Sequence, residues 1–137
     1  MLKIMDIPIE VLKEKARRMR ILSVKATTEA GSGHPSSCLS AADLASVIFF
    51  QQMRYNPEEP DNPSNDRFIL SKGHAAPLLY AAYSEAGIVD EATTMTLRQL
   101  DSNLEGHPTP RIPWVDVATG SLGQGLSAGL GIALAAQ

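Results

Sequence analysis

The stretch VDVATGSLGQGLSAGLGIALAA, from Val115 to Ala136, contains the pattern on which the expected fold depends. It begins with a short β-branched run, residues 115–119, which predicts a strand. A glycine-rich turn follows over residues 120–125, and a helix of small residues is expected from about Leu126. The stretch therefore predicts a strand, a glycine turn and a helix N-terminus in succession.

Two interpretations of this turn are open. Backbone N–H groups and the helix dipole favour an anion at a helix N-terminus, and glycine lets the backbone approach the anion without an intervening Cβ. One hypothesis is therefore a phosphate or diphosphate cradle over residues 120–125. The other is a tight turn into a core helix whose small residues, including Gly129 and Gly131, lie close to another backbone.

Length and composition are those of one ordinary globular domain. The chain has 137 residues, of which 44% are hydrophobic and 20% charged, with a net charge of −3. A slightly acidic chain with 5% aromatic residues is a poor candidate for nonspecific nucleic-acid binding, and no apolar run reaches bilayer length. We therefore expect neither nucleic-acid nor membrane partners. The single cysteine, Cys38, and the lack of a recognisable signal peptide favour a cytoplasmic location.

The rest of the chain alternates helical patterns with loops and one further apolar run. Helices are expected over residues 8–30, 40–53, 75–86 and 90–100. Ser40 is the expected N-cap of the second helix, with Asp43 as its capping-box partner, which leaves residues 33–37 as a loop. The run at residues 66–71 predicts a buried strand. Strands separated by helices predict a three-layer α/β fold with a largely parallel sheet, in which ligands bind beyond the carboxyl ends of the strands.

Each of the three histidines, His34, His74 and His107, directly follows a glycine. Glycine accounts for 10 of 137 residues, so this pattern has a chance of roughly 4 in 10,000 at that abundance. Histidines on glycine-flanked loops suit a shared cleft, where they orient phosphate oxygens, move protons or polarise a carbonyl. A zinc site is the competing interpretation, but the spacings of 40 and 33 residues are unlike the short spacings of typical zinc sites.

Three further features have a plain structural interpretation as well as a functional one. Lys72 either meets a phosphate or lies on the surface, and Ser37 either donates to an anion or shapes a turn. Residues 123–128 match the dinucleotide fingerprint G-x-G-x-x-A between a predicted strand and a predicted helix. The acidic residue that this fingerprint expects about 20 positions later would lie beyond Gln137, and no P-loop sequence is present.

Four motifs together resemble the transketolase family, at the start of its N-terminal, diphosphate-binding domain. They are AGSGHP (30–35), LSKGHAA (70–76), EGHP (105–108) and ATGSLGQG (118–125). The resemblance runs from about residue 8 to the last residue. The motif SKGHA distinguishes this sequence from the related deoxyxylulose-phosphate synthases. Dihydroxyacetone synthase is a closer relative of transketolase, and the motifs do not distinguish between these two enzymes. Residues 1–137 are thus identified as an incomplete N-terminal diphosphate-binding domain, a three-layer thiamine-diphosphate-binding fold in part.

The resemblance implies a role for each matching residue. His34 corresponds to a histidine that contacts the donor sugar and assists proton transfer, and His107 to one that faces the thiazolium and the substrate hydroxyls. Both are therefore candidate catalytic residues, and Lys72 joins His34 as a candidate substrate-binding residue. The implied cofactor contacts are Ser37, His74, Gly120, Ser121 and Leu122. A nicotinamide site at residues 123–128 is not compatible with this assignment.

The resemblance also implies the reaction and its partners. Transketolases transfer a two-carbon ketol unit from a ketose phosphate to an aldose phosphate, using thiamine diphosphate and Mg²⁺, as homodimers. The family's magnesium motif, Gly-Asp-Gly followed by Asn, is absent from this sequence and would come just after its last residue, so no metal ligand is assigned. The glutamate that activates the cofactor belongs to a later domain.

We therefore expect the chain alone to be inactive. One hypothesis is the N-terminal part of a working transketolase, which the end of the sequence inside a predicted helix favours. The alternative is a non-catalytic fragment, or a complementing subunit of a split thiamine-diphosphate enzyme. A chain that ends within a domain is also expected to be poorly soluble.

Overall fold

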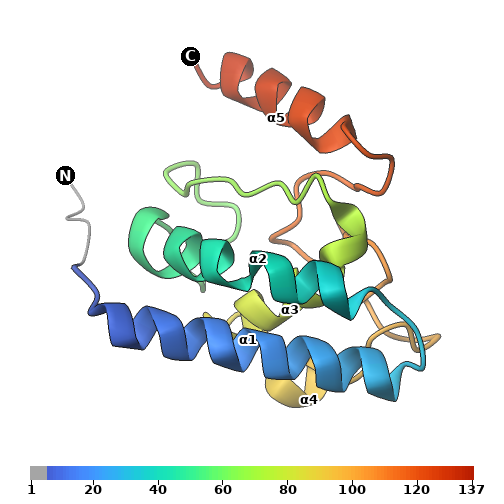
Figure 1. Cartoon of the computed structure of the whole chain (residues 1–137). Coiled ribbons are helices and arrows are strands. Elements are labelled where there is room, and N and C mark those ends of the chain that lie inside the picture. Colours follow the sequence, from blue (N-terminus) through green and yellow to red (C-terminus); the bar gives the residue numbers. More distant parts are fainter. Residues whose placement is uncertain (1–5) are drawn as a thin grey trace.

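The computed structural model describes residues 6–137, in which the chain forms helices joined by long loops and no strand (Figure 1). The elements are α1 (Ile9–Glu29), α2 (Pro35–Val47), the π-helical turn η1 (Ile48–Gln52), the 3₁₀ turn η2 (Gly73–Ala75), α3 (Ala76–Glu85), α4 (Glu91–Thr94) and α5 (Gln124–Ala135). The predicted helices at residues 8–30 and 75–86 and the helix from about residue 126 are confirmed within a few residues.

The core lies where α1, α2 and α3 pack against one another (Figure 1). Apolar residues of α1 recur at helical spacing and form one buried face, which includes Leu12, Ala16 and Met19. In α3, by contrast, every residue from Ala76 to Tyr83 is buried. This helix is therefore held on all sides, and groups attached to it have fixed positions.

Glycines end α1 and α3 in the same way. Gly31 and Gly87 adopt left-handed φ values of 58° and 78°. The next residue then donates back into the last turn, with Ser32 N 3.1 Å from Thr27 O and Ile88 N 2.9 Å from the Tyr83 carbonyl oxygen. This is the Schellman arrangement, so both glycines end their helices.

The predicted start of α2 was wrong. The helix begins at Pro35 with His34 as its N-cap residue, so Ser40 lies inside the helix and donates to Ser37 O at 2.9 Å. Proline is well suited to the first helical position, because its φ is preset and its missing N–H needs no partner there. Asp43, the expected capping-box partner, instead forms an ion pair with Arg20 of α1 at 2.6 Å.

The helix predicted over residues 90–100 is confirmed only in its first turn. Asp90 caps α4 by accepting a hydrogen bond from Thr93 N. Turns follow, and Arg98 has a φ of 62°. A left-handed residue cannot continue a right-handed α-helix, so the chain leaves the helical path before residue 100.

Neither predicted strand, residues 66–71 or 115–119, forms in the described part of the chain, so the sheet is not confirmed. Their backbone donors go to loop carbonyls, as when Asp66 N donates to Arg54 O at 2.8 Å and Thr119 N to Pro108 O at 3.3 Å. A parallel ladder needs those donors for the neighbouring strand. The two segments nevertheless run side by side in parallel: Arg67 pairs with Asp116 at 2.9 Å, and Thr119 Oγ1 donates to Leu70 O at 2.8 Å.

Helix α5 stands apart from the other helices and lies against the segment at residues 69–71 (Figure 1). A Cβ on Gly125 would lie 2.6 Å from Ser71 Cα, and one on Gly129 would lie 3.4 Å from Ile69 Cδ1. Glycine is therefore required for this contact at Gly125. None of the described helices is both long and apolar enough to cross a membrane.

Candidate functional site

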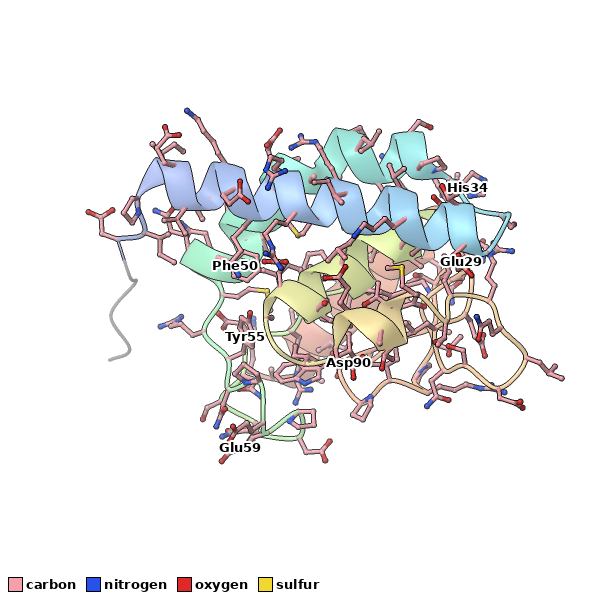
Figure 2. All side chains as sticks on the ribbon, turned by 90° about the horizontal axis from the view of Figure 1, so that it is seen from below. Glu29, His34, Phe50, Tyr55, Glu59 and Asp90 are labelled. Atoms are coloured by element: carbon pink, nitrogen blue, oxygen red, sulfur yellow. The ribbon has the colours of Figure 1, made fainter. Side chains whose placement is uncertain are left out.

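Two of the three histidines are in direct contact. His34 is the N-cap residue of α2 and follows the α1–α2 turn. It lies at the end of α2 opposite to η1, which carries Phe50 (Figure 2). His74 lies in η2, directly before α3. Their ring centroids are 5.1 Å apart with an interplanar angle of 61°. Residues separated by 40 positions are thus in contact, and their sharing one functional site stays a prediction.

Ser37 joins this pair from the first turn of α2. Its Oγ lies 3.0 Å from His74 Nε2, and the tautomer of the imidazole decides which atom donates. The start of α2 at Pro35 makes this contact possible, because it places Ser37 on the turn that faces η2. Ser37 therefore both shapes the helix start and contacts a candidate cofactor-binding residue.

The environment of His74 disfavours its charged form. Desolvation by burial has the largest effect, and the positive charges of His34, Lys72 and His107 add to it, so the pKa of His74 lies below its ordinary value. His74 is therefore neutral near pH 7, and its ring has one donor and one acceptor nitrogen. Lys72, which is exposed, acts on the site through its charge.

Gly120 connects His107 to the turn that carries His74. A Cβ on Gly120 would lie 3.1 Å from His107 Cδ2, so the imidazole lies directly against this backbone. On the other side, a Cβ on Gly73 would lie 2.7 Å from both Gly120 N and Thr119 C. The two glycines let two turns approach more closely than any side chain would allow. His107 is thereby placed near the turn that carries His74.

The loop that carries His107 is held by a residue that sequence reasoning missed. The Tyr80 hydroxyl donates to Glu105 O at 2.9 Å and lies 3.4 Å from His107 O. Tyr80 is fully buried in α3. The available signal was a tyrosine within an otherwise apolar helix, because a buried phenol needs a hydrogen-bond partner, but the sequence does not name that partner.

The turn at residues 120–123 leads into α5 with its backbone accessible. Gly123 is the N-cap residue, in the left-handed conformation with a φ of 96°, and Gln124 N donates to Ser121 O at 3.1 Å. Ser121 and Leu122 are exposed, and their amides donate to no acceptor among residues 6–137. The close packing of Gly125 supports the tight-turn interpretation. The amides of Ser121 and Leu122 are available to an anion, so the anion cradle stays a prediction.

Two cavities of the described structure lie away from the histidines. One of about 690 Å³ lies between residues 65–71 and α5, and one of about 580 Å³ lies between α1 and the end of α3; neither is lined by a histidine. Residues 6–137 include no group of three or more His, Cys, Asp or Glu side chains placed to hold a metal ion.

Comparisons with known proteins give one consistent family. Residues 11–137 match the family model described as the transketolase thiamine diphosphate binding domain. "Transketolase-like protein 2" of Bos taurus is 59% identical over 125 residues, covering 91% of this chain and 20% of that protein. One of the subunits of the apulose-4-phosphate transketolase of Phocaeicola vulgatus is 36% identical over 129 residues, covering 94% of this chain and 46% of that protein.

A solved structure agrees. The transketolase of Pichia stipitis, in a structure described as a complex with sedoheptulose-7-phosphate, is 40% identical, with a TM-score of 0.88 over 91% of this chain and 19% of that one. The described backbone therefore has the fold of the corresponding part of a transketolase. The chain spans about a fifth of the length of the bovine protein. It belongs to the transketolase family, and its residues 11–137 match that family's thiamine diphosphate binding domain.

Proposed function

We propose that this chain supplies the histidine-bearing part of the thiamine diphosphate site of a transketolase, which moves a two-carbon ketol unit from a ketose phosphate to an aldose phosphate. The convergence of His34, His74 and His107 from three distant segments is the observation that carries the proposal. A solved relative is described as a complex with sedoheptulose-7-phosphate, a ketose phosphate, which supports sugar phosphates as the substrates.

The residues present fit thiamine diphosphate. Ser37 and His74 offer polar hydrogens on one side of the site, and the open amides of Ser121 and Leu122 offer donors near the N-terminus of α5. The close approach permitted by Gly120 holds the His107 imidazole beside these donors. When bound, the cofactor supplies a nucleophilic carbon and an electron sink.

In this proposal the chain's own residues bind, orient and move protons. His34 contacts the donor sugar and His107 faces its hydroxyls, so both are placed to pass protons. Lys72, exposed at the entrance to η2, attracts the sugar phosphate. His74 stays neutral because of its lowered pKa, so it binds the diphosphate through a hydrogen bond.

Other parts of the site lie outside the described residues in this proposal. Magnesium would offset the charge of the diphosphate, with ligands that the family resemblance expects beyond residue 137. A parallel sheet of a three-layer α/β fold would likewise form in the complete protein, where residues 66–71 and 115–119 already run in parallel. We expect that protein to be a cytoplasmic homodimer.

A split enzyme is the second candidate, because the relative from Phocaeicola vulgatus is named as one subunit of a transketolase. In that case the chain is a complementing subunit whose partner provides the missing groups. Titration calorimetry with thiamine diphosphate and Mg²⁺ tests the expectation that the chain is incomplete alone. No heat of binding is expected, whereas saturable, magnesium-dependent binding would show a self-sufficient module.

A chimera tests the catalytic proposal. Residues 11–137 would replace the matching segment of the Pichia stipitis transketolase, and ketol transfer would be followed with a ketose phosphate and an aldose phosphate. Loss of a proton-transferring side chain costs about 10²–10⁴-fold in rate, so we expect losses of that order for His34→Ala and His107→Ala. Lys13→Ala, on the exposed face of α1, is the control. An active chimera that tolerates both histidine substitutions would contradict the proposal.

A further inference from the structure

The hydroxyl of Tyr80 is shared between two carbonyl groups of the loop that carries His107. It lies 2.9 Å from Glu105 O and 3.4 Å from His107 O. A phenol has one proton to donate, so the carbonyls of Glu105 and His107, on either side of Gly106, share a single donor. This contact joins the loop to α3, whose residues from 76 to 83 are all buried.

Tyr80 remains a donor over the whole pH range in which the site would work. Desolvation by burial, followed by the negative charge of Glu105, raises the pKa of Tyr80 well above that of a free phenol. The hydroxyl therefore keeps its proton in neutral and moderately alkaline solution, and the contact does not switch with pH there.

The other contacts of the loop are made by side chains or lie on either side of His107. Arg111 pairs with the Glu105 carboxylate at 3.1 Å, and the Arg98 guanidinium lies against Gly106. Arg98 N donates to Leu104 O at 2.8 Å before the histidine, and Thr119 N donates to Pro108 O at 3.3 Å after it. Between these two points, the Tyr80 hydroxyl is the donor that reaches the carbonyls of Glu105 and His107.

The same helix also fixes His74. Residues 73–75 form η2, which leads directly into α3 at Ala76, so His74 and Tyr80 belong to one continuous helical segment. His107 in turn lies against Gly120. Both histidines are thus located relative to α3, one through the chain itself and the other through a side-chain hydroxyl.

We propose that Tyr80 is a positioning residue, whose hydroxyl holds the His107 imidazole against Gly120 and at a fixed place relative to His74. The inference rests on the proposed function, since it concerns how His107 is oriented for its role there. Tyr80 acts through His107, because its own side chain is fully buried in α3.

The test compares Tyr80→Phe with Tyr83→Phe in the 137-residue chain. Tyr83 is a matched control because it is also buried in α3 and its hydroxyl donates to a loop carbonyl, Trp114 O, at 2.9 Å. The readouts are the nuclear Overhauser effect between His107 Hδ2 and Gly120 Hα, and the couplings that report the χ1 rotamer of His107.

We expect Tyr80→Phe to reduce the His107–Gly120 Overhauser effect at least about twofold and to average the χ1 couplings, because a released loop samples several rotamers. Tyr83→Phe should leave both unchanged. An unchanged His107 in folded Tyr80→Phe, or equal changes in the two variants, would overturn the inference. Turnover of the chimera tests the proposed function separately, so failure of one is distinguishable from failure of the other.

A measurement on the unsubstituted chain covers the case in which Tyr80→Phe does not fold. A buried, hydrogen-bonded hydroxyl proton exchanges slowly with water, and the Tyr80 proton should show a cross-peak to the Gly106 amide. A Tyr80 hydroxyl in fast exchange, without that cross-peak, would refute the proposed contact.

Discussion

At the scale of single residues, the site depends on the mutual influence of neighbouring charges. His74 is partly buried, and His34, Lys72 and His107 all add positive charge around it. Each of these charges disfavours protonation of the imidazole, in addition to the larger effect of desolvation. The pKa of His74 therefore depends on whether His34, Lys72 and His107 lie close to it.

The first prediction follows from this sensitivity. Lys72→Gln removes a positive charge close to His74, so we expect the pKa of His74 to rise toward its ordinary value and the protonated form to persist to higher pH. Titration of the histidine resonances by NMR measures this shift. Lys13→Gln removes a charge that lies in an exposed pair with Glu10 and should leave the titration unchanged; an equal shift in both variants would contradict the prediction.

Sequence reasoning succeeded at residues whose signal is local. The three Gly-His pairs indicated one site, and the structure brings His34 and His74 into contact. It failed for Tyr80, because the acceptors of a buried hydroxyl lie 25 and 27 residues away in the chain. Nothing in the residues around a tyrosine identifies partners at that distance.

At the scale of elements, a charged contact joins the beginning of the chain to the end of α3. The Glu85 side chain is 4% exposed and accepts from Lys15 at 3.0 Å and Arg18 at 2.6 Å, both on α1. Lys15 also donates to the Glu85 carbonyl oxygen at 3.0 Å. This contact fixes the packing of α1 against the helix that carries Tyr80.

The second prediction concerns this contact. Glu85→Gln keeps the shape of the side chain but removes its charge, so the free energy of unfolding should fall by about 1.5–3 kcal/mol, the range for hydrogen bonds to charged groups. Urea denaturation measures the change. Glu10→Gln disrupts an exposed pair with Lys13 and should cost less than about 1 kcal/mol. Equal losses would show that the burial of Glu85 has no energetic consequence.

Elements were predictable where their cause is local. The stops of α1 and α3 followed from Gly31 and Gly87, because only a residue that accepts positive φ completes the Schellman turn. The strands at residues 66–71 and 115–119 were not, because a strand requires backbone partners that local apolarity cannot supply. The start of α2 was misplaced because the preference for proline at the first helical position prevailed over a later serine.

At the scale of the whole molecule, α5 presents an apolar surface. Three leucines of α5 are spaced four residues apart, and therefore on one helix face, and are between 59% and 77% exposed: Leu126, Leu130 and Leu134. Leu122, in the turn before the helix, is 72% exposed. The 690 Å³ cavity between this helix and residues 65–71 extends the apolar region. Large exposed apolar patches promote association in water, which agrees with the expectation of poor solubility.

The third prediction tests that surface. The chain should self-associate as its concentration rises, and the pair Leu126→Glu and Leu130→Glu should reduce the weight-average mass measured by sedimentation. Leu100→Glu is the control, because Leu100 is 94% exposed outside α5. If association persists in the double variant but is lost in Leu100→Glu, the surface that causes self-association lies elsewhere in the molecule.

The close contact of Gly73 with Thr119 and Gly120 also has a consequence for the order of folding. Helices α1, α2 and α3 end by Glu85, so their mutual contacts form early in synthesis. His34 and His74 are then already together. The turn at residues 119–120 emerges some thirty residues later in the chain, and contacts of long sequence separation form slowly. We therefore expect the site to form in two stages, and His107 to take its final position only after the turn at residues 119–120 has been synthesised.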